Sequence, residues 1–263
     1  MLRIHKWKFC KRFIFFEEII VNIFPAIDLK DNKCVRLTKG KDDTTIIFNE
    51  DPVSQASYFE QMGCKRLHLI DLDSAFGRRG INSGTIKKIR KAISIPIQLG
   101  GGIRNEEDVK FFFDINIDYL ILGSFSATEP ERVITLSKSY PEKIYVSVDV
   151  LSNKVMIKGW EQKTSLKSKD VYEKYKDTNI RGYILTDIEN DGMLNGLNIK
   201  LISENLKLTK KRLIVGGGLT NYEDIKNLLA INSKNLEGVI SGKSYYVGNI
   251  NLKIAQEIIN KNA

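Results

Sequence analysis

An internal repeat of short motifs limits the fold of this chain more than any other feature. The repeated segments are residues 100–103 with 216–219, 69–71 with 185–187, 27–28 with 148–149, and 122–124 with 241–243. The first pair is glycine-rich in both copies and lies 116 residues apart, and the other pairs follow in the same order at similar spacings. Two homologous halves are therefore predicted, with each functional element present twice.

From residue 23 onward, short runs of β-branched residues alternate with amphipathic helical stretches, which is typical of parallel βα units. Strands are predicted at residues 23–28, 66–71, 96–99, 119–122, 144–150, 182–186, 212–215 and 238–241. One helix, over 52–62, has Asp51 as its N-cap, Pro52 at its first position and Gly63 as its stop. Eight such units favour an α/β fold, a (β/α)8 TIM barrel with a two-fold half-barrel repeat, over an open doubly wound sheet.

The first 22 residues lie outside this pattern. Their basic and aromatic residues resemble a targeting sequence, but Glu17 and Glu18 interrupt the segment and no small-residue cleavage site follows. We interpret residues 1–22 as a poorly ordered extension and residues 23–263 as a single barrel domain. Three cysteines without CxxC spacing favour a reducing compartment, so a cytoplasmic protein is expected.

The net charge of +9 would attract phosphates, nucleic acid or an anionic membrane. The basic residues are scattered, however, and no five stand in a row, so a small phosphorylated substrate suits the field equally well. We expect a monomer without a nucleic-acid or membrane partner. A silent barrel that binds nucleic acid stays open as the non-enzymatic alternative, and salt-dependent RNA binding that is lost on deleting residues 1–22 would support it.

Two aspartates end otherwise apolar strands at equivalent places in the two halves, Asp28 and Asp149. A carboxylate there is costly unless it is solvated, paired or used, and barrels of this class carry their active sites at these strand ends. Two carboxyls that face each other suit general acid and base chemistry. The alternative is that the two aspartates only cap the loops that follow their strands. A metal site would require more clustered ligands than the sequence offers, so no metal is predicted.

Glycine-rich strand ends predict two phosphate sites, because glycine lets backbone N–H groups approach an anion. The first site combines Gly101, Gly102, Arg104, Gly123 and Ser124, and the second combines Gly217, Gly218, Gly242 and Lys243. Two such sites across one barrel mouth imply a long substrate with a phosphate at each end. The alternative is that these glycines serve only tight turns between strands and helices.

Seven motifs, at residues 24–29, 35–40, 67–73, 100–104, 159–160, 186–188 and 191–192, carry a resemblance to a known family. From about residue 23 onward the chain resembles the phosphoribosylformimino-aminoimidazole carboxamide ribotide isomerases of histidine biosynthesis. The resemblance implies a half-barrel-symmetric (β/α)8 fold and a cofactor-free Amadori rearrangement of a bisphosphorylated ribotide from aminoaldose to aminoketose. It also implies that Asp28 is the base at C2′, Asp149 the acid at the ring oxygen and Thr186 its assistant. Trp160 would stack on the substrate, and Arg104 would hold a phosphate.

Two related enzymes are the closest alternatives. The cyclase subunit that follows in the same pathway opens with a Cys-Leu-Asp-like strand, whereas this chain has Pro25-Ala26-Ile27-Asp28. Phosphoribosylanthranilate isomerase uses a cysteine base where this chain has Asp28, although some relatives act on both substrates. Trp160 favours the single-substrate type. The polar segments 40–49 and 154–169 are expected to be mobile loops over the site.

Overall fold

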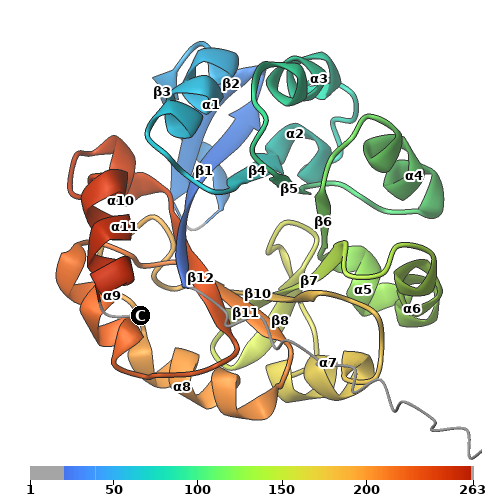
Figure 1. The fold of residues 1–263 in the computed structure, drawn as a ribbon. Coiled ribbons are helices and arrows are strands. Elements are labelled where there is room, and N and C mark those ends of the chain that lie inside the picture. Colours follow the sequence, from blue (N-terminus) through green and yellow to red (C-terminus); the bar gives the residue numbers. More distant parts are fainter. Residues whose placement is uncertain (1–20, 39, 262–263) are drawn as a thin grey trace, which may run out of the picture.

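Eight parallel strands pair edge to edge and close on themselves in the computed structural model, which describes residues 21–38 and 40–261 (Figure 1). The barrel strands are β1 (Asn22–Lys30), β4 (Leu67–Asp71), β5 (Ile97–Gly100), β6 (Tyr119–Leu122), β7 (Ile144–Leu151), β10 (Gly182–Asp187), β11 (Arg212–Gly216) and β12 (Leu236–Ser241). The ring closes where β12 pairs in parallel with β1. All the predicted strands are confirmed, as is the (β/α)8 TIM-barrel fold.

Helices lie outside the barrel and follow each strand (Figure 1). They are α1 (Pro52–Gln61), α3 (Ser83–Ala92), α4 (Glu106–Asp114), α6 (Pro130–Ser139), α7 (Ser168–Tyr175), α8 (Ile199–Leu208), α9 (Tyr222–Leu229) and α11 (Leu252–Lys261). Helix α1 confirms its predicted ends, because the Asp51 side chain accepts from two first-turn N–H groups and Gly63 adopts a φ of +82°. Shorter helices, α2 (Leu72–Ala75), α5 (Ser124–Thr128) and α10 (Lys243–Tyr246), follow β4, β6 and β12 directly.

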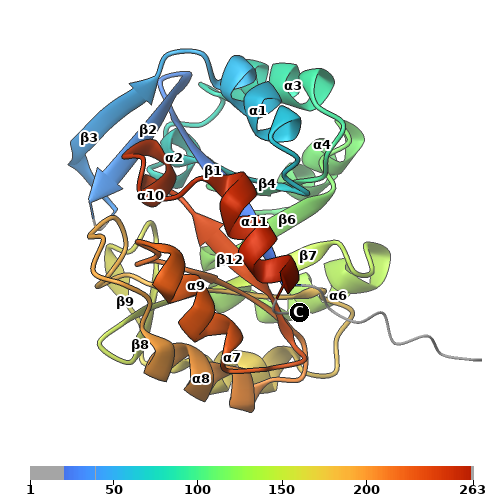
Figure 2. The same ribbon diagram turned by 60° about the vertical axis from the view of Figure 1, so that its left-hand side comes forward.

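Residues 40–49 and 154–169, which were expected to be loops, contain antiparallel strands instead. The first segment forms β3 (Lys41–Asn49), which pairs with β2 (Lys33–Thr38), and the second contains β8 (Lys154–Ile157) and β9 (Gln162–Lys163). Figure 2 shows both hairpins at the same end of the barrel. The polar composition of these segments suggested loops because no residue of β3 or β9 is buried, and an antiparallel strand with a solvated face does not need a continuous apolar run.

The two halves repeat each other in detail, which confirms the predicted half-barrel repeat. In the first half, the amide of Asn82 donates to the Asp71 carboxylate at 2.7 Å. In the second half, the amide of Asn198 donates to the Asp187 carboxylate at 3.0 Å. Both residues of the second pair stand 116 positions after those of the first. The hairpins after β1 and β7, the first strands of the two halves, follow the same symmetry.

The barrel interior is filled at its amino-terminal end and open at the other. A buried cluster of Phe24, Ile121, Tyr145, Ile184 and Ile214 packs inside the barrel, separate from the larger core between strands and helices. Also in the barrel interior, the guanidinium of Arg66 is paired with the Glu237 carboxylate at 2.9 Å, and both residues are buried. Cavity space is therefore left at the carboxyl ends of the strands.

The predicted domain boundary falls within one residue of the start of β1 at Asn22. Val21 already packs against the core. Residues 1–20 of the predicted extension lie outside the described residues, and the division into extension and single domain stays a prediction. In the part of the chain that is described, no helix is long and apolar enough to cross a membrane.

Candidate active site

One cavity of about 870 Å³ opens at the carboxyl ends of the barrel strands. All the residues predicted from the sequence line it, namely Asp28, Gly101, Gly102, Arg104, Gly123, Ser124, Asp149, Trp160, Thr186, Gly217, Gly218, Gly242 and Lys243. Parallel strands bring their ends to one rim, so residues separated by more than 200 positions meet here. The structure thus joins the two predicted phosphate sites and the predicted carboxyls in a single site.

Asp28 stands on β1 beside a buried arginine that the sequence prediction did not select. The Arg36 guanidinium, on β2, forms an ion pair with the Asp28 carboxylate and donates to the Ala26 carbonyl oxygen. It also lies 5.1 Å from the centroid of the Tyr246 ring, a cation–π contact. A lone arginine within the apolar strand CVRLT was the available clue, because a buried guanidinium requires an anionic partner.

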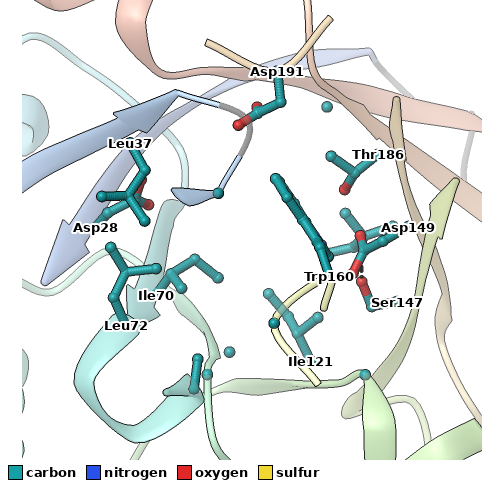
Figure 3. A pocket seen from close by; sticks show the side chains of 18 of the residues that line it. Asp28, Leu37, Ile70, Leu72, Ile121, Ser147, Asp149, Trp160, Thr186 and Asp191 are labelled. Carbon is teal, nitrogen blue, oxygen red and sulfur yellow. Dashed lines mark hydrogen bonds between the residues drawn. The ribbon is translucent and has the colours of Figure 1, made fainter. Parts of the chain in front are cut away.

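Asp149 faces Asp28 from the opposite wall, on β7 (Figure 3). The Ser147 hydroxyl donates to its carboxylate at 2.9 Å. Burial raises the pKa of Asp149, while hydrogen bonds from Thr186, Trp160 and Ser147 act in the opposite direction. The net shift is upward, so this carboxyl retains its proton more readily than an exposed aspartate.

Asp191 is a third carboxyl in the cavity, and the sequence prediction missed it. It lies on the turn that follows β10, and in Figure 3 it points toward the space between Asp28 and Asp149. Burial raises the pKa of Asp191 to about 7, and the negative charges of Asp28 and Asp149 add to the effect, which Arg36 partly offsets. A second acid soon after the repeated Thr186-Asp187 motif was the clue that could have identified it.

The three carboxyls do not form a metal centre. Among residues 21–38 and 40–261, no three His, Cys, Asp or Glu side chains are arranged to hold a metal ion. Burial raises the pKa of both Asp149 and Asp191, and buried carboxyls with a raised pKa are typical of acid–base catalysis.

Trp160 projects into the middle of the cavity from the loop between β8 and β9. Figure 3 shows its ring between the wall that carries Asp28 and the wall that carries Asp149. The residue has a φ of +71°, a left-handed conformation that is costly for an aromatic residue. Its ring packs so closely on Gly40 that a Cβ there would lie 2.5 Å from it. Trp160 therefore shares the cavity with Asp28, Asp149 and Asp191.

The first predicted phosphate site lies where β5 and β6 end. Gly101 and Gly102 have left-handed φ values of +98° and +67°, which turn the backbone around the rim. The Ser124 hydroxyl accepts a hydrogen bond from the Lys158 backbone N–H at 2.7 Å. Arg104 lines the cavity, but its guanidinium donates to two carbonyl oxygens of α2, those of Ser74 and Ala75, at 3.3 Å each.

The second predicted phosphate site lies where β11 and β12 end, four strands around the barrel from the first. Gly217 and Gly218 repeat the left-handed turn, with φ values of +82° and +100°. Gly242 approaches the guanidinium of Arg36, so that a Cβ there would lie 3.2 Å from its central carbon. This site therefore adjoins the Asp28 ion pair. The Lys243 ammonium donates to the Gly192 carbonyl oxygen at 2.7 Å.

Adding one methyl group to either glycine turn should damage both stability and phosphate binding. A Cβ at Gly101 would lie 2.2 Å from the Asp71 carbonyl oxygen, and one at Gly217 would lie 2.3 Å from that of Asp187. We expect Gly101→Ala and Gly217→Ala each to cost about 1–3 kcal/mol of unfolding free energy. Urea denaturation measures this, and Gly84→Ala, where a Cβ meets nothing within 4 Å, is the matched control. A pair of variants as stable as the control would contradict the steric argument.

Comparison with known proteins agrees with this geometry. Residues 22–251 match the family described as histidine biosynthesis protein. A Nautilia profundicola protein named 1-(5-phosphoribosyl)-5-((5-phosphoribosylamino)methylideneamino) imidazole-4-carboxamide isomerase is 44% identical over 241 residues, covering 92% of this chain and 99% of its own length. Proteins of the same name from Prochlorococcus marinus and a Thermoanaerobacter species are 42% and 38% identical, over 89% and 90% of this chain and 92% and 99% of their own lengths. Because these matches span nearly the whole barrel, the chain belongs to the histidine biosynthesis protein family.

Proposed function

We propose that this chain is an aldose–ketose isomerase that converts phosphoribosylformimino-aminoimidazole carboxamide ribotide to its phosphoribulosyl form. The observation that carries the proposal is that three carboxyls and the two glycine-rich strand-end turns line one cavity. A ribotide with a phosphate at each end would span the two sites and leave its reacting ribose at the carboxyls. The names of the close relatives support the same substrate.

Ring opening is the first chemical step. A carboxylic acid donates a proton to the ring oxygen of the aminoaldose, the bond between that oxygen and C1′ breaks, and the nitrogen lone pair forms a C1′=N iminium. Asp149 is the acid that the family resemblance implies. Asp191 has the same capacity, since burial raises the pKa of each and the pKa of Asp191 is about 7. We propose that the acid function belongs to this pair.

Proton removal from C2′ is the second step, and we assign it to Asp28. A base must be ionised before it acts, and the adjoining Arg36 guanidinium stabilises a carboxylate charge. The C2′ electron pair forms an enaminol and neutralises the iminium. The enol then loses its hydroxyl proton while C1′ gains one, which gives the aminoketose. The reaction rearranges hydrogen within one molecule, so the proposal includes no cofactor and no metal.

The remaining assignments concern binding. We propose that Gly101, Gly102, Gly123 and Ser124 hold one phosphate, that Gly217, Gly218 and Gly242 hold the other, and that Arg104 and Lys243 flank them. Glycine turns of this kind direct backbone N–H groups toward anions. Trp160 is assigned to stacking on the substrate. Residues 23–263 would form the catalytic domain of a cytoplasmic monomer, consistent with Cys34 and Cys64 being free thiols.

The test is conversion of the ribotide by the purified full chain in the presence of EDTA, followed in a coupled assay with the cyclase and ammonia. Turnover is expected, with no loss on chelation. Phosphoribosylanthranilate is the second substrate to assay, and its turnover would identify a dual-substrate enzyme. A folded protein that leaves the ribotide unchanged would refute the proposal, and the cyclase reaction would be tested next.

A further inference from the structure

The Lys243 side chain spans two neighbouring barrel units. Lys243 begins α10 after β12, whereas its acceptor, the Gly192 carbonyl oxygen at 2.7 Å, belongs to the turn after β10. Strand β11 lies between β10 and β12 in the sheet. The lysine therefore crosses the mouth end of β11, next to Gly217 and Gly218 of the proposed second phosphate site, before it reaches the turn.

The turn that receives this hydrogen bond carries Asp191. Around Asp191 the backbone hydrogen bonds are local, from Asp191 N to the Ile188 oxygen at 3.3 Å and from Met193 N to the Asn190 oxygen at 3.1 Å. The flanking residues are tied to other barrel units, Ile188 N to the Val150 oxygen and Gly196 N to the Gly218 oxygen, each at 3.1 Å. Gly192 also packs on β2, where an added Cβ would lie 2.8 Å from the Leu37 carbonyl oxygen. Two contacts from outside therefore hold the turn, its packing on β2 and the hydrogen bond from Lys243.

The position of this turn decides how well the Asp191 carboxyl is shielded from water. The charged groups that act on it are Asp28 and Arg36 from β1 and β2, Asp149 from β7 and Asp187 from β10. Burial outweighs them all as the cause of its raised pKa. A turn that moved outward would hydrate the carboxyl and favour its charged form.

From this geometry we infer that Lys243 is a positioning residue: it holds the Asp191 turn against the cavity from the rim of the second phosphate site, and so keeps the proton donor in place for ring opening. The inference rests on the proposed function, in which Asp191 belongs to the acid pair. It goes beyond phosphate binding because the lysine acts through Gly192 on a group in a different barrel unit.

The other half of the barrel contains a parallel arrangement. Ser124 occupies the position equivalent to Lys243, after the repeated strand-end glycine. Its hydroxyl accepts from the Lys158 N–H at 2.7 Å, on the loop that carries Trp160, and Trp160 donates to Asp149. In both halves, then, a residue at the rim of a proposed phosphate site is hydrogen-bonded to a loop or turn. In one half that segment carries Trp160, which contacts Asp149, and in the other it carries Asp191.

The experiment compares Lys243→Met with Lys243→Arg in the full chain, with Lys253→Met, an exposed lysine of α11, as the control. Carbon-13 NMR titration follows the Asp191 carboxyl, whose resonance is identified by its loss in Asp191→Asn. In Lys243→Met we expect the pKa of Asp191 to fall by about one unit as the turn admits water. We also expect kcat for the ribotide to fall about tenfold with a smaller change in KM. Arginine, which can still donate to Gly192, should restore most of both.

Three results would overturn the inference. An unchanged Asp191 titration in Lys243→Met would show that the lysine does not hold the turn. A raised KM with kcat unaltered would make Lys243 a phosphate contact only. A lower Tm with equal losses in Lys243→Arg would indicate a general structural role. Failure of the proposed function itself is recognised separately, because wild-type protein would then leave the ribotide unchanged while the NMR titration could still be read.

Discussion

Replacement of Asp28 by asparagine is expected to lower kcat/KM for the ribotide about a thousandfold. Asparagine has nearly the same shape and can still accept a hydrogen bond from Arg36, but it cannot take the C2′ proton. The site faces a cavity at the barrel mouth, away from the main core, so the fold should persist. Steady-state kinetics with thermal denaturation measures both effects.

Asp114→Asn is the matched control for this change, because Asp114 is an exposed carboxylate at the end of α4. The control should retain wild-type kinetics. If Asp28→Asn turned over the ribotide at a rate close to that of the control, Asp28 would not be the base.

Replacement of Asp191 by asparagine is expected to lower kcat about a hundredfold and to change its pH dependence. An acid catalyst acts while protonated, so wild-type kcat should decline as pH rises through the Asp191 pKa of about 7. The variant lacks the titrating group, so its residual kcat should not show this decline at high pH, the alkaline limb of the pH profile. A variant that keeps both the rate and the limb would remove Asp191 from the acid pair.

The same substitution should alter stability in a pH-dependent way. The folded-state pKa of Asp191 lies above its ordinary value, so between about pH 4 and 7 the folded protein binds a proton that the unfolded chain has released. Its contribution to stability is therefore present at low pH and is lost as pH rises. Asp191→Asn should exceed the wild type in Tm at pH 8, with a smaller difference at pH 5. A difference independent of pH would contradict the linkage.

Asp149→Asn separates the two members of the acid pair. Three side chains, from Ser147, Thr186 and Trp160, donate toward the Asp149 carboxylate, and such donors favour its charged form. Asp191 owes its higher pKa to burial and to neighbouring negative charge. If Asp191 supplies the ring-opening proton, the alkaline limb should remain in Asp149→Asn and vanish only in Asp191→Asn.

Much of the barrel could be predicted from the sequence because its evidence is local. Apolar runs such as residues 119–122 specify a buried parallel strand by themselves, and the structure places β6 at those residues. The hairpins after β1 and β7 could not be predicted in this way. No residue of β3 is buried, so the strand conformation of this segment depends on pairing with β2 rather than on its own composition.

Some residues of the candidate site could likewise be predicted from local motifs, and others depend on distant parts of the chain. Glycine turns and strand-end aspartates follow from motif and position, since a (β/α)8 topology sends every strand end to one rim. Arg36 and Asp191 lie within motifs 35–40 and 191–192, but they were not predicted as site residues because their importance depends on neighbours far away in the sequence. The ion pair of Arg36 with Asp28 requires β2 to fold back on β1, and the pKa of Asp191 reflects burial beside Asp28 and Asp149.

The repeat, the order of strands and helices, the closed barrel and the residues at its rim could all be predicted from the chain, because periodicity, caps and glycine turns act over a few neighbouring positions. The folded protein was needed to show that Asp28 is paired, that Asp191 is shielded from water and that Lys243 reaches across β11 to Gly192. These properties depend on desolvation and on charges within a few ångströms, and both arise only when distant segments pack together.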